Sequence, residues 1–182
     1  MKGQPTIEFN EEKFKELVLY LAEESEDDPW FGATKLNKLL FYADFYAYGH
    51  FGKPITGAEY QVLQHGPAPK KLLPIRLQMI RDKDLQIRRE RVLRFTQQRP
   101  IALRKANVSV FSADELSLVN DLLRWLGDRT AGEISELSHA EVCWQLADLN
   151  EEIPYTAVFL SSRKPTKWHF ERGEQIAAQI AA

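Results

Sequence analysis

A helix rich in aromatic residues is the feature that most restricts how this chain can fold. Residues 34–48 carry apolar side chains three and four positions apart, the spacing that gathers them on one helical face: Leu36, Leu39, Leu40, Ala43 and Ala47. Phenylalanine and tyrosine occupy many positions between them, so apolar surface continues around much of the cylinder. We expect Thr34 to cap the start of this helix and Gly49 to end it. A helix of this kind is buried on most sides or docks a partner.

A rigid corner follows at Gln64-His-Gly-Pro-Ala-Pro69. Gly66 can adopt backbone angles that other residues reach only with difficulty, and proline suits the start of a helix because its missing N-H is not needed there. The corner therefore predicts a stiff connection, with a helix over residues 69–81. The face of that helix expected to be buried carries Leu72, Leu73, Arg76, Leu77 and Ile80.

The remaining elements are predicted from helix-capping residues and from a change in the spacing of apolar residues. A first helix is expected over residues 10–26 with Asn10 as its cap, and Ser112 and Thr130 each open a capping box with a glutamate three residues later. From Leu85 to Val110 apolar residues alternate, which predicts two or three short antiparallel strands reversing at residues 99–100 and 106–107. The sequence thus predicts an α+β fold: a mainly α-helical single domain over residues 1–182 with a small antiparallel β-sheet or hairpin, in which residues 150–182 form a C-terminal extension.

Composition restricts the compartment more than the activity. Cys143 is the single cysteine, and the sequence contains neither a signal peptide nor a long apolar run. We therefore expect a cytoplasmic protein with no membrane association.

Charge is unevenly distributed, although the net charge is only −2. Residues 1–28 and 106–182 each carry a net charge of −6, whereas residues 29–85 carry +4 and residues 86–105 carry +6. Acidic helices and a basic hairpin that neutralise each other across the fold explain this pattern most simply. A basic face that meets an acidic partner or nucleic acid is the alternative.

Three motifs in order carry a resemblance to a known family. Lys35-Leu-Asn-Lys-Leu-Leu-Phe-Tyr-Ala-Asp44, the turn at Gly52-Lys-Pro-Ile55 and the corner at residues 64–69 resemble the Panacea domain of the SocA-like antitoxin family, over residues 14–144. The resemblance implies a phage-associated or bacterial antitoxin of a type II toxin-antitoxin system, as in a prophage. Such a protein would neutralise a cognate protein toxin by protein-protein interaction, without enzyme activity or a cofactor.

Other functions stay open beside this one. A proteolytic adaptor that delivers a toxin to a Clp-type protease belongs to the same family, and the terminal Ala181-Ala182 is similar to tags that such proteases read. A nucleic-acid-binding regulator could use the arginines of residues 88–105, although this class fits a pI of about 6.1 poorly. A homo-oligomer is also possible.

The candidate partner-binding residues come from the motif helix, the corner and the basic segment: Lys35, Lys38, Tyr42, Asp44, His65, Arg88, Arg89, Arg91 and Arg94. For Asp44 a structural role is favoured, because a carboxylate beside an apolar stripe needs a lysine, a tyrosine or a backbone N-H as its partner. His65 is expected to shape the corner or to cap the next helix.

Residues suited to catalysis or metal binding are few. His50, His65, His139 and His169 show no metal-ligand spacing. His139 and Cys143 lie four positions apart, so on a continuous helix they would share a face and could form an imidazole-activated thiolate, as in a hydrolase. A lone cysteine is more often a small buried apolar residue, and we expect that role for Cys143.

Overall fold

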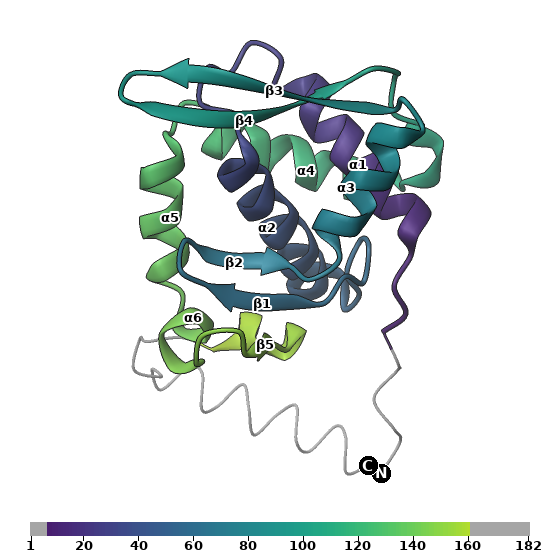
Figure 1. Ribbon diagram of the computed structural model, residues 1–182. Helices are drawn as coiled ribbons and strands as arrows, with labels where there is room; N and C mark the ends of the chain where they lie inside the picture. The colour runs from purple at the N-terminus through teal and green to yellow at the C-terminus, as the bar shows by residue number, and fades with distance from the viewer. Residues whose placement is uncertain (1–6, 161–182) are drawn as a thin grey trace, which may run out of the picture.

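The computed structural model describes residues 7–160. The elements follow in the order α1 (Glu11–Glu24), α2 (Ala33–Phe51), β1 (Tyr60–Leu63), β2 (Gly66–Pro69), α3 (Leu72–Arg81), β3 (Leu85–Val92), β4 (Phe95–Ala102), a 3-10 turn η1 (Val108–Val110), α4 (Ala113–Leu126), α5 (Ala131–His139), α6 (Val142–Leu146), β5 (Glu152–Ile153) and a 3-10 turn η2 (Tyr155–Phe159). The predicted α+β class with a mainly helical composition is confirmed (Figure 1). The C-terminal part of the expected extension, including the tag-like Ala181-Ala182, lies outside the described residues.

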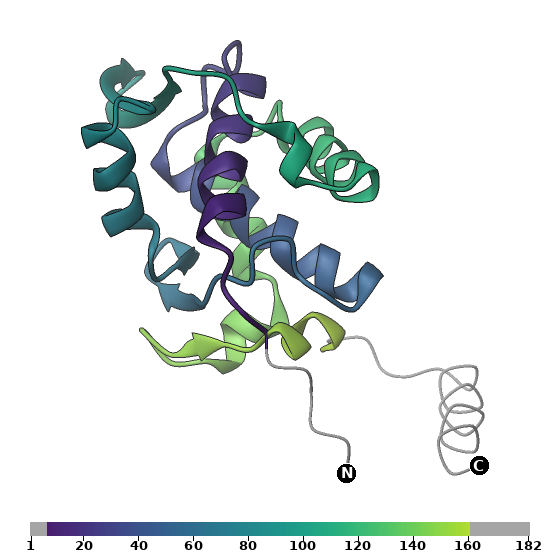
Figure 2. The same cartoon turned by 90° about the vertical axis from the view of Figure 1, so that its right-hand side faces the viewer.

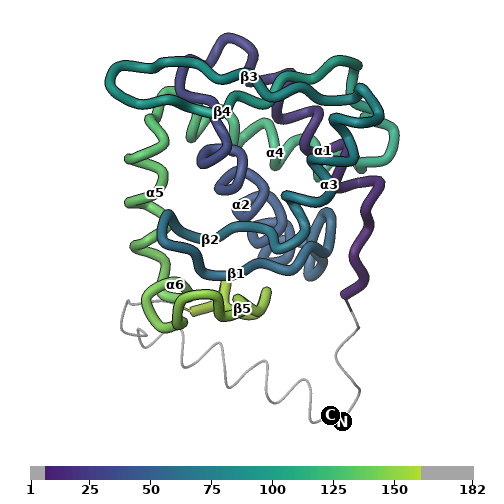
Figure 3. Tube along the Cα trace, viewed as in Figure 1, coloured from purple at the N-terminus to yellow at the C-terminus, as the bar shows by residue number. Residues whose placement is uncertain are grey.

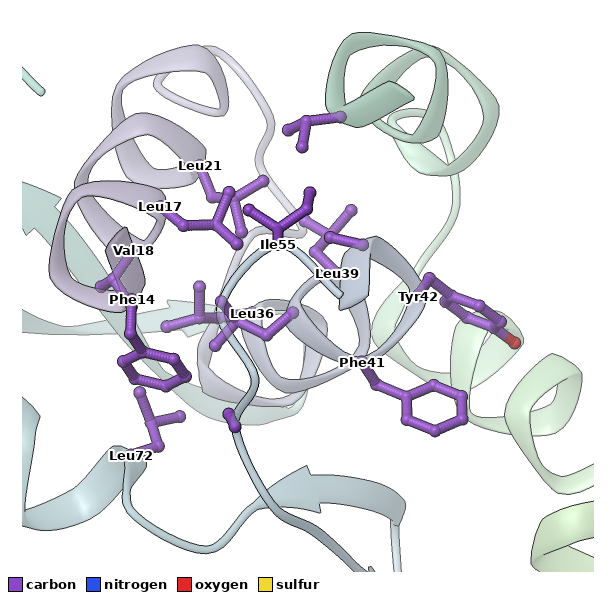
Figure 4. Close-up of a cluster of buried hydrophobic side chains, with 14 of the residues drawn as sticks. Phe14, Leu17, Val18, Leu21, Leu36, Leu39, Phe41, Tyr42, Ile55 and Leu72 are labelled. Atoms are coloured by element: carbon purple, nitrogen blue, oxygen red, sulfur yellow. The ribbon is translucent and has the colours of Figure 1, made fainter. Parts of the chain in front are cut away.

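Helix α2 runs through the middle of the molecule (Figure 3). Its apolar stripe is buried as predicted, and Leu36 and Leu39 pack against Phe14 and Leu17 of α1 (Figure 4). Burying large apolar side chains is the main driving force for folding, at roughly 1.5–3 kcal/mol for each. The central helix therefore organises the core.

The ends of α2 differ from the prediction. Gly32, and not Thr34, occupies the cap position, and the helix passes through Gly49 to end at Gly52, whose φ is 72°. Gly49 lies against Val158 of η2, so it serves close packing within the helix. The left-handed backbone that ends a helix is easiest for glycine, which explains why Gly52 takes this position.

Caps elsewhere follow the sequence closely. The side chain of Asn10 accepts a hydrogen bond from the backbone N-H of Lys13 at the start of α1. Both predicted capping boxes are present, at Ser112 for α4 and at Thr130 for α5. Figure 2 shows α1 between α3 on one side and α4 on the other.

The first sheet has the strand order β2-β1-β5 and is antiparallel throughout. Gly66–Pro69 was predicted to be a stiff connection and is in fact the edge strand β2, paired from Tyr60↔Pro69 to Leu63↔Gly66. Proline is tolerated there because an edge strand has N-H positions that need no partner. β5 and η2 come from the predicted C-terminal extension, and β5 completes this sheet.

The second sheet is the hairpin β3-β4, with register from Leu85↔Ala102 to Val92↔Phe95. The predicted reversal at Arg99-Pro100 is wrong, because both residues lie inside β4 and the chain turns at Leu93-Arg94 instead. Residues 108–110, expected to be a strand, form η1. The segment with alternating apolar residues, which the structure describes in full, therefore forms two strands, β3 and β4, and no third strand.

Helix α3 ends at Arg81 as expected but turns a different face inward. Its buried residues are Leu72, Ile75 and Met79, whereas Leu73, Leu77 and Ile80 are exposed. Two apolar stripes run along this helix, and periodicity could not tell which of them faces the core. Pro74 lies in the first turn, where its missing N-H removes no helical hydrogen bond.

Candidate partner-binding surface

Asp44 lies at the centre of a buried polar network. Its side chain is fully covered and accepts hydrogen bonds from the backbone N-H of Thr56 at 2.6 Å, the hydroxyl of Tyr60 at 2.7 Å and the hydroxyl of Thr56. Burial raises the pKa of Asp44, and the bonds from Thr56 and Tyr60 oppose that shift. The expected tyrosine and backbone partners are confirmed. Asp44 joins the loop before β1 to α2. Because both of its carboxylate oxygens are buried and hydrogen-bonded, neither is accessible to a partner.

Lys35 and Lys38 are also inside the molecule, each with 1% of its surface exposed. The ammonium of Lys35 forms an ion pair with Asp28 at 2.5 Å and donates to the carbonyls of Gly127 and Arg129 at 2.8 and 3.0 Å. It thereby joins α2 to the loops before it and after α4.

Lys38 donates to one carbonyl, that of Pro67, at 3.1 Å. Burial lowers the pKa of Lys38 to about 7. Tyr42 is equally covered, and burial raises the pKa of its hydroxyl. The prediction that Lys35, Lys38, Tyr42 and Asp44 contact a partner is therefore corrected: the fold covers all four, because α2 is the central helix.

His65 lies in the turn between β1 and β2 with its side chain exposed. Its carbonyl oxygen accepts a bond of 3.4 Å from the hydroxyl of Ser135 on α5. The suggestion that His65 caps the next helix is wrong, since α3 begins at Leu72, its cap residue is Lys71 and no side chain caps it.

The basic segment separates into internal and exposed arginines. Arg99 is buried and donates to the carbonyls of Ser25, Glu26 and Asp28, which lie in the turn after the end of α1. Arg104 binds the carboxylates of Glu16 and Asp84. These bonds anchor the base of the hairpin to α1.

Arg88 is exposed but paired with Glu90 on its own strand. Arg89, Arg91 and Arg94 are exposed, and among residues 7–160 none of the three has a side-chain hydrogen bond or an ion pair. Neutralisation across the fold thus accounts for Arg104, and main-chain carbonyls hold Arg99, whereas a basic surface remains at the outer half of the hairpin.

The hairpin tip carries two apolar side chains that the sequence reasoning missed. Leu93 is 75% exposed and Phe95 is 76% exposed. Leu93 also adopts a φ of 53°, a left-handed conformation that costs a residue with a side chain about 1–2 kcal/mol. The sequence Val92-Leu-Arg-Phe95 carries a signal for this exposure. Two-residue hairpin turns usually consist of Asn-Gly or Asp-Gly, whereas Leu93-Arg94 forms the turn here and bulky Phe95 follows it. We call Arg89, Arg91, Leu93, Arg94 and Phe95 the tip surface.

Chemistry at Cys143 has no support from the geometry. α5 ends at His139 and a separate helix carries Cys143, so the continuous helix that would align the two side chains is absent from the described chain. The thiol is buried, and burial raises its pKa to about 11. His139 instead stacks on Trp144, with ring centroids 3.9 Å apart. A thiol of this kind is largely protonated at neutral pH and is a weak nucleophile.

Within residues 7–160 no group of three His, Cys, Asp or Glu side chains could hold a metal ion. No helix in that part of the chain is both long and apolar enough to cross a bilayer.

Comparison with known proteins identifies one family. The family model described as antitoxin SocA-like, Panacea domain, matches residues 36–145, more than half of the chain. The match covers α2 from Leu36 onward, both hairpins and the helices through most of α6. No curated protein and no solved structure matches the chain. The chain belongs to the SocA-like antitoxin family with a Panacea domain.

Proposed function

We propose that this protein is the antitoxin of a type II toxin-antitoxin pair, and that it neutralises a protein toxin by covering part of its surface with the tip surface. Family membership supports the antitoxin role. The observation that carries the choice of surface is the combination of two exposed apolar side chains, Leu93 and Phe95, with three arginines that have no partner among the described residues.

The composition of the tip suits a protein partner. Aromatic residues and arginine are enriched at the energetic centres of interfaces, because they bury large areas and form several hydrogen bonds. Arginine also binds carboxylates in a bidentate manner, so an acidic toxin surface is the matching chemistry. Toxin binding would bury Leu93 and Phe95, which water now surrounds.

Nucleic acid is the second candidate for the same surface, because exposed arginines also bind phosphates. The two partners differ in salt dependence. An interface made chiefly with phosphates loses affinity steeply as salt rises, whereas one centred on apolar contacts changes less.

Growth rescue tests the proposal. The protein encoded beside the gene for this chain is taken as the candidate toxin and is expressed in a host. The host should stop growing, and co-expression of the antitoxin should restore growth. Reversal of Arg89, Arg91 and Arg94 to glutamate should abolish the rescue. The matched control reverses Lys53, Arg81 and Lys105, three exposed cations away from the tip, so the net charge changes equally. Loss of rescue in both variants, or in neither, would remove the tip from the interface.

Toxin turnover separates inhibition from delivery to a protease. A stoichiometric inhibitor leaves the half-life of the toxin unchanged or longer, and forms a stable complex that can be isolated. An adaptor makes the degradation of the toxin depend on its own presence. A shorter half-life in the presence of this protein would favour the adaptor.

A further inference from the structure

A cavity of about 360 Å³ lies beside the first turns of α2, away from the hairpin tip. Its walls come from α2, from the β1-β2 turn and from the segment before β5, and include Asn37, Lys38, Leu63, His65, Gly66 and Leu149. The β1-β2 turn lies against α5, which closes this side of the molecule (Figure 1). The size is within the range of pockets that hold small organic molecules.

The Lys38 ammonium is the unusual group in this cavity. Lys35, one turn earlier and equally covered, has a carboxylate and two carbonyls around its nitrogen. Lys38 has the carbonyl of Pro67 alone among the described residues, although an ammonium can donate three hydrogen bonds. A buried cation without a counter-charge is costly, so an anion in the cavity would stabilise it.

Asn37, which lines the cavity, also has a polar atom without a partner in the described part of the chain. The side-chain oxygen Oδ1 of Asn37 is buried, and among residues 7–160 it accepts no hydrogen bond. It is an acceptor, so a ligand would have to supply a donor for it. The local field is positive as well: burial first, then the charges of Lys38 and His65, lower the pKa of His139 on the neighbouring α5.

The position of Lys38 is fixed by the backbone around it. Gly66 has a φ of 94°, and a Cβ at this position would lie 2.7 Å from Cε and 2.9 Å from Nζ of Lys38. The turn therefore packs directly on the ammonium. A donor held in place in this way needs little reorganisation when it binds an acceptor.

We propose that this cavity binds a small organic carboxylate that also carries a hydroxyl group. The carboxylate accepts from the Lys38 ammonium, the hydroxyl donates to Oδ1 of Asn37, and the carbon chain contacts Leu63 and Leu149. The inference is independent of the toxin, since no residue of the tip surface contributes to it.

Calorimetric titration with 3-hydroxybutyrate tests the site, and its uncharged amide serves as the control ligand. The acid should bind at pH 7 and the amide at least tenfold more weakly. Burial lowers the pKa of Lys38 to about 7, so Lys38 loses its charge between pH 7 and 9. The other titratable side chains near it are His65 and His139, and burial lowers the pKa of His139. The dissociation constant should rise up to about tenfold per pH unit, with uptake of close to one proton.

Two variants complete the experiment. Lys38→Met should weaken binding of the acid at least tenfold, whereas Lys70→Met, which removes a partly exposed lysine paired with Glu59 and Glu152, should leave it unchanged. Asn37→Leu should remove the preference for 3-hydroxybutyrate over butyrate. If Lys38→Met does not fold, the pH titration of the unaltered protein decides. Equal binding of acid and amide, or an affinity independent of pH, would overturn the proposal, as would the absence of binding.

Discussion

Lys35 and Lys38 lie one helical turn apart on α2 and are equally buried, yet only Lys35 has a carboxylate beside it. The difference arises from what the rest of the chain brings to each nitrogen. Lys35 meets Asp28 and the loop after α4, whereas Lys38 meets the edge strand β2 and a cavity. One lysine therefore joins elements of the fold, and the other retains unused donors.

Stability should rise with pH above 7 because of Lys38. Its pKa is lowered to about 7 in the folded chain, below the ordinary value of 10.5, so between these values the unfolded chain binds one proton more. The free energy of unfolding then increases as pH rises, on the order of 2 kcal/mol from pH 7 to 9. Urea unfolding of the natural chain and Lys38→Met at both pH values checks this, since the variant should lack that part of the increase. Equal pH dependence would contradict it.

Gly66→Ala should be more damaging than Gly52→Ala. Both glycines have left-handed backbone angles, at 94° and 72°, but a Cβ at Gly66 would lie 2.4 Å from the hydroxyl of Ser138, whereas one at Gly52 meets nothing within 4 Å. Gly52→Ala should cost about 1 kcal/mol from backbone strain alone. Gly66→Ala should cost at least about 3 kcal/mol, since the clash adds to the strain. Thermal unfolding of both variants measures the difference, and similar losses would refute the close approach.

Arg104→Met should destabilise the protein at neutral pH and alter its response to acid. Arg104 is the main cause of the lowered pKa of Glu16, so this pair contributes stability above the ordinary value of 4.5 and loses it as pH falls through the lower, folded value. We expect a loss of about 2 kcal/mol at pH 7. The variant should also depend less on pH in the acid range.

The control for this change is Arg124→Met, which breaks the exposed pair with Asp121 on α4. An exposed pair is worth about 0.5 kcal/mol or less. Denaturant unfolding between pH 3 and 7 compares the two variants. An equally small effect of both would show that Arg104 does not anchor the hairpin.

Leu93→Asn should separate folding from toxin neutralisation. Asparagine adopts the left-handed backbone of this position more readily than leucine, so the free energy of unfolding should stay equal or rise by up to about 1 kcal/mol. Growth rescue should nevertheless be lost, because the apolar contact disappears. Leu103→Asn, at an exposed leucine outside the tip, should keep both properties. Rescue by Leu93→Asn at the natural level would place the interface elsewhere.

Local signals predicted much of the fold from sequence. The aromatic stripe of α2, the cap at Asn10 and the two capping boxes each depend on residues within one or two turns, and all are present. The errors concern long-range choices. Periodicity is consistent with either of two apolar faces of α3 being buried. Arg99-Pro100 has the local sequence of a turn, and its place inside β4 depends on hydrogen bonds from Arg99 to carbonyls after α1, which are distant in the chain.

The candidate site was less predictable for the same reason. The burial of Lys35 depends on the carbonyls of Gly127 and Arg129, more than 90 residues away in the chain, and nothing near Lys35 announces them. Arg89, Arg91 and Arg94 are candidates from sequence alone because they belong to one basic segment. Leu93 and Phe95 were assigned to a regular strand, and their exposure follows only from the position of the turn.

The anchoring of the hairpin through Arg99 has a consequence for how this molecule can change over generations. Three main-chain oxygens hold that guanidinium, and main-chain atoms persist whatever side chains surround them. Residues beyond the anchor can then vary with little effect on the core. A descendant could acquire a new target through a few replacements in one short loop, while inheriting the rest of its architecture intact.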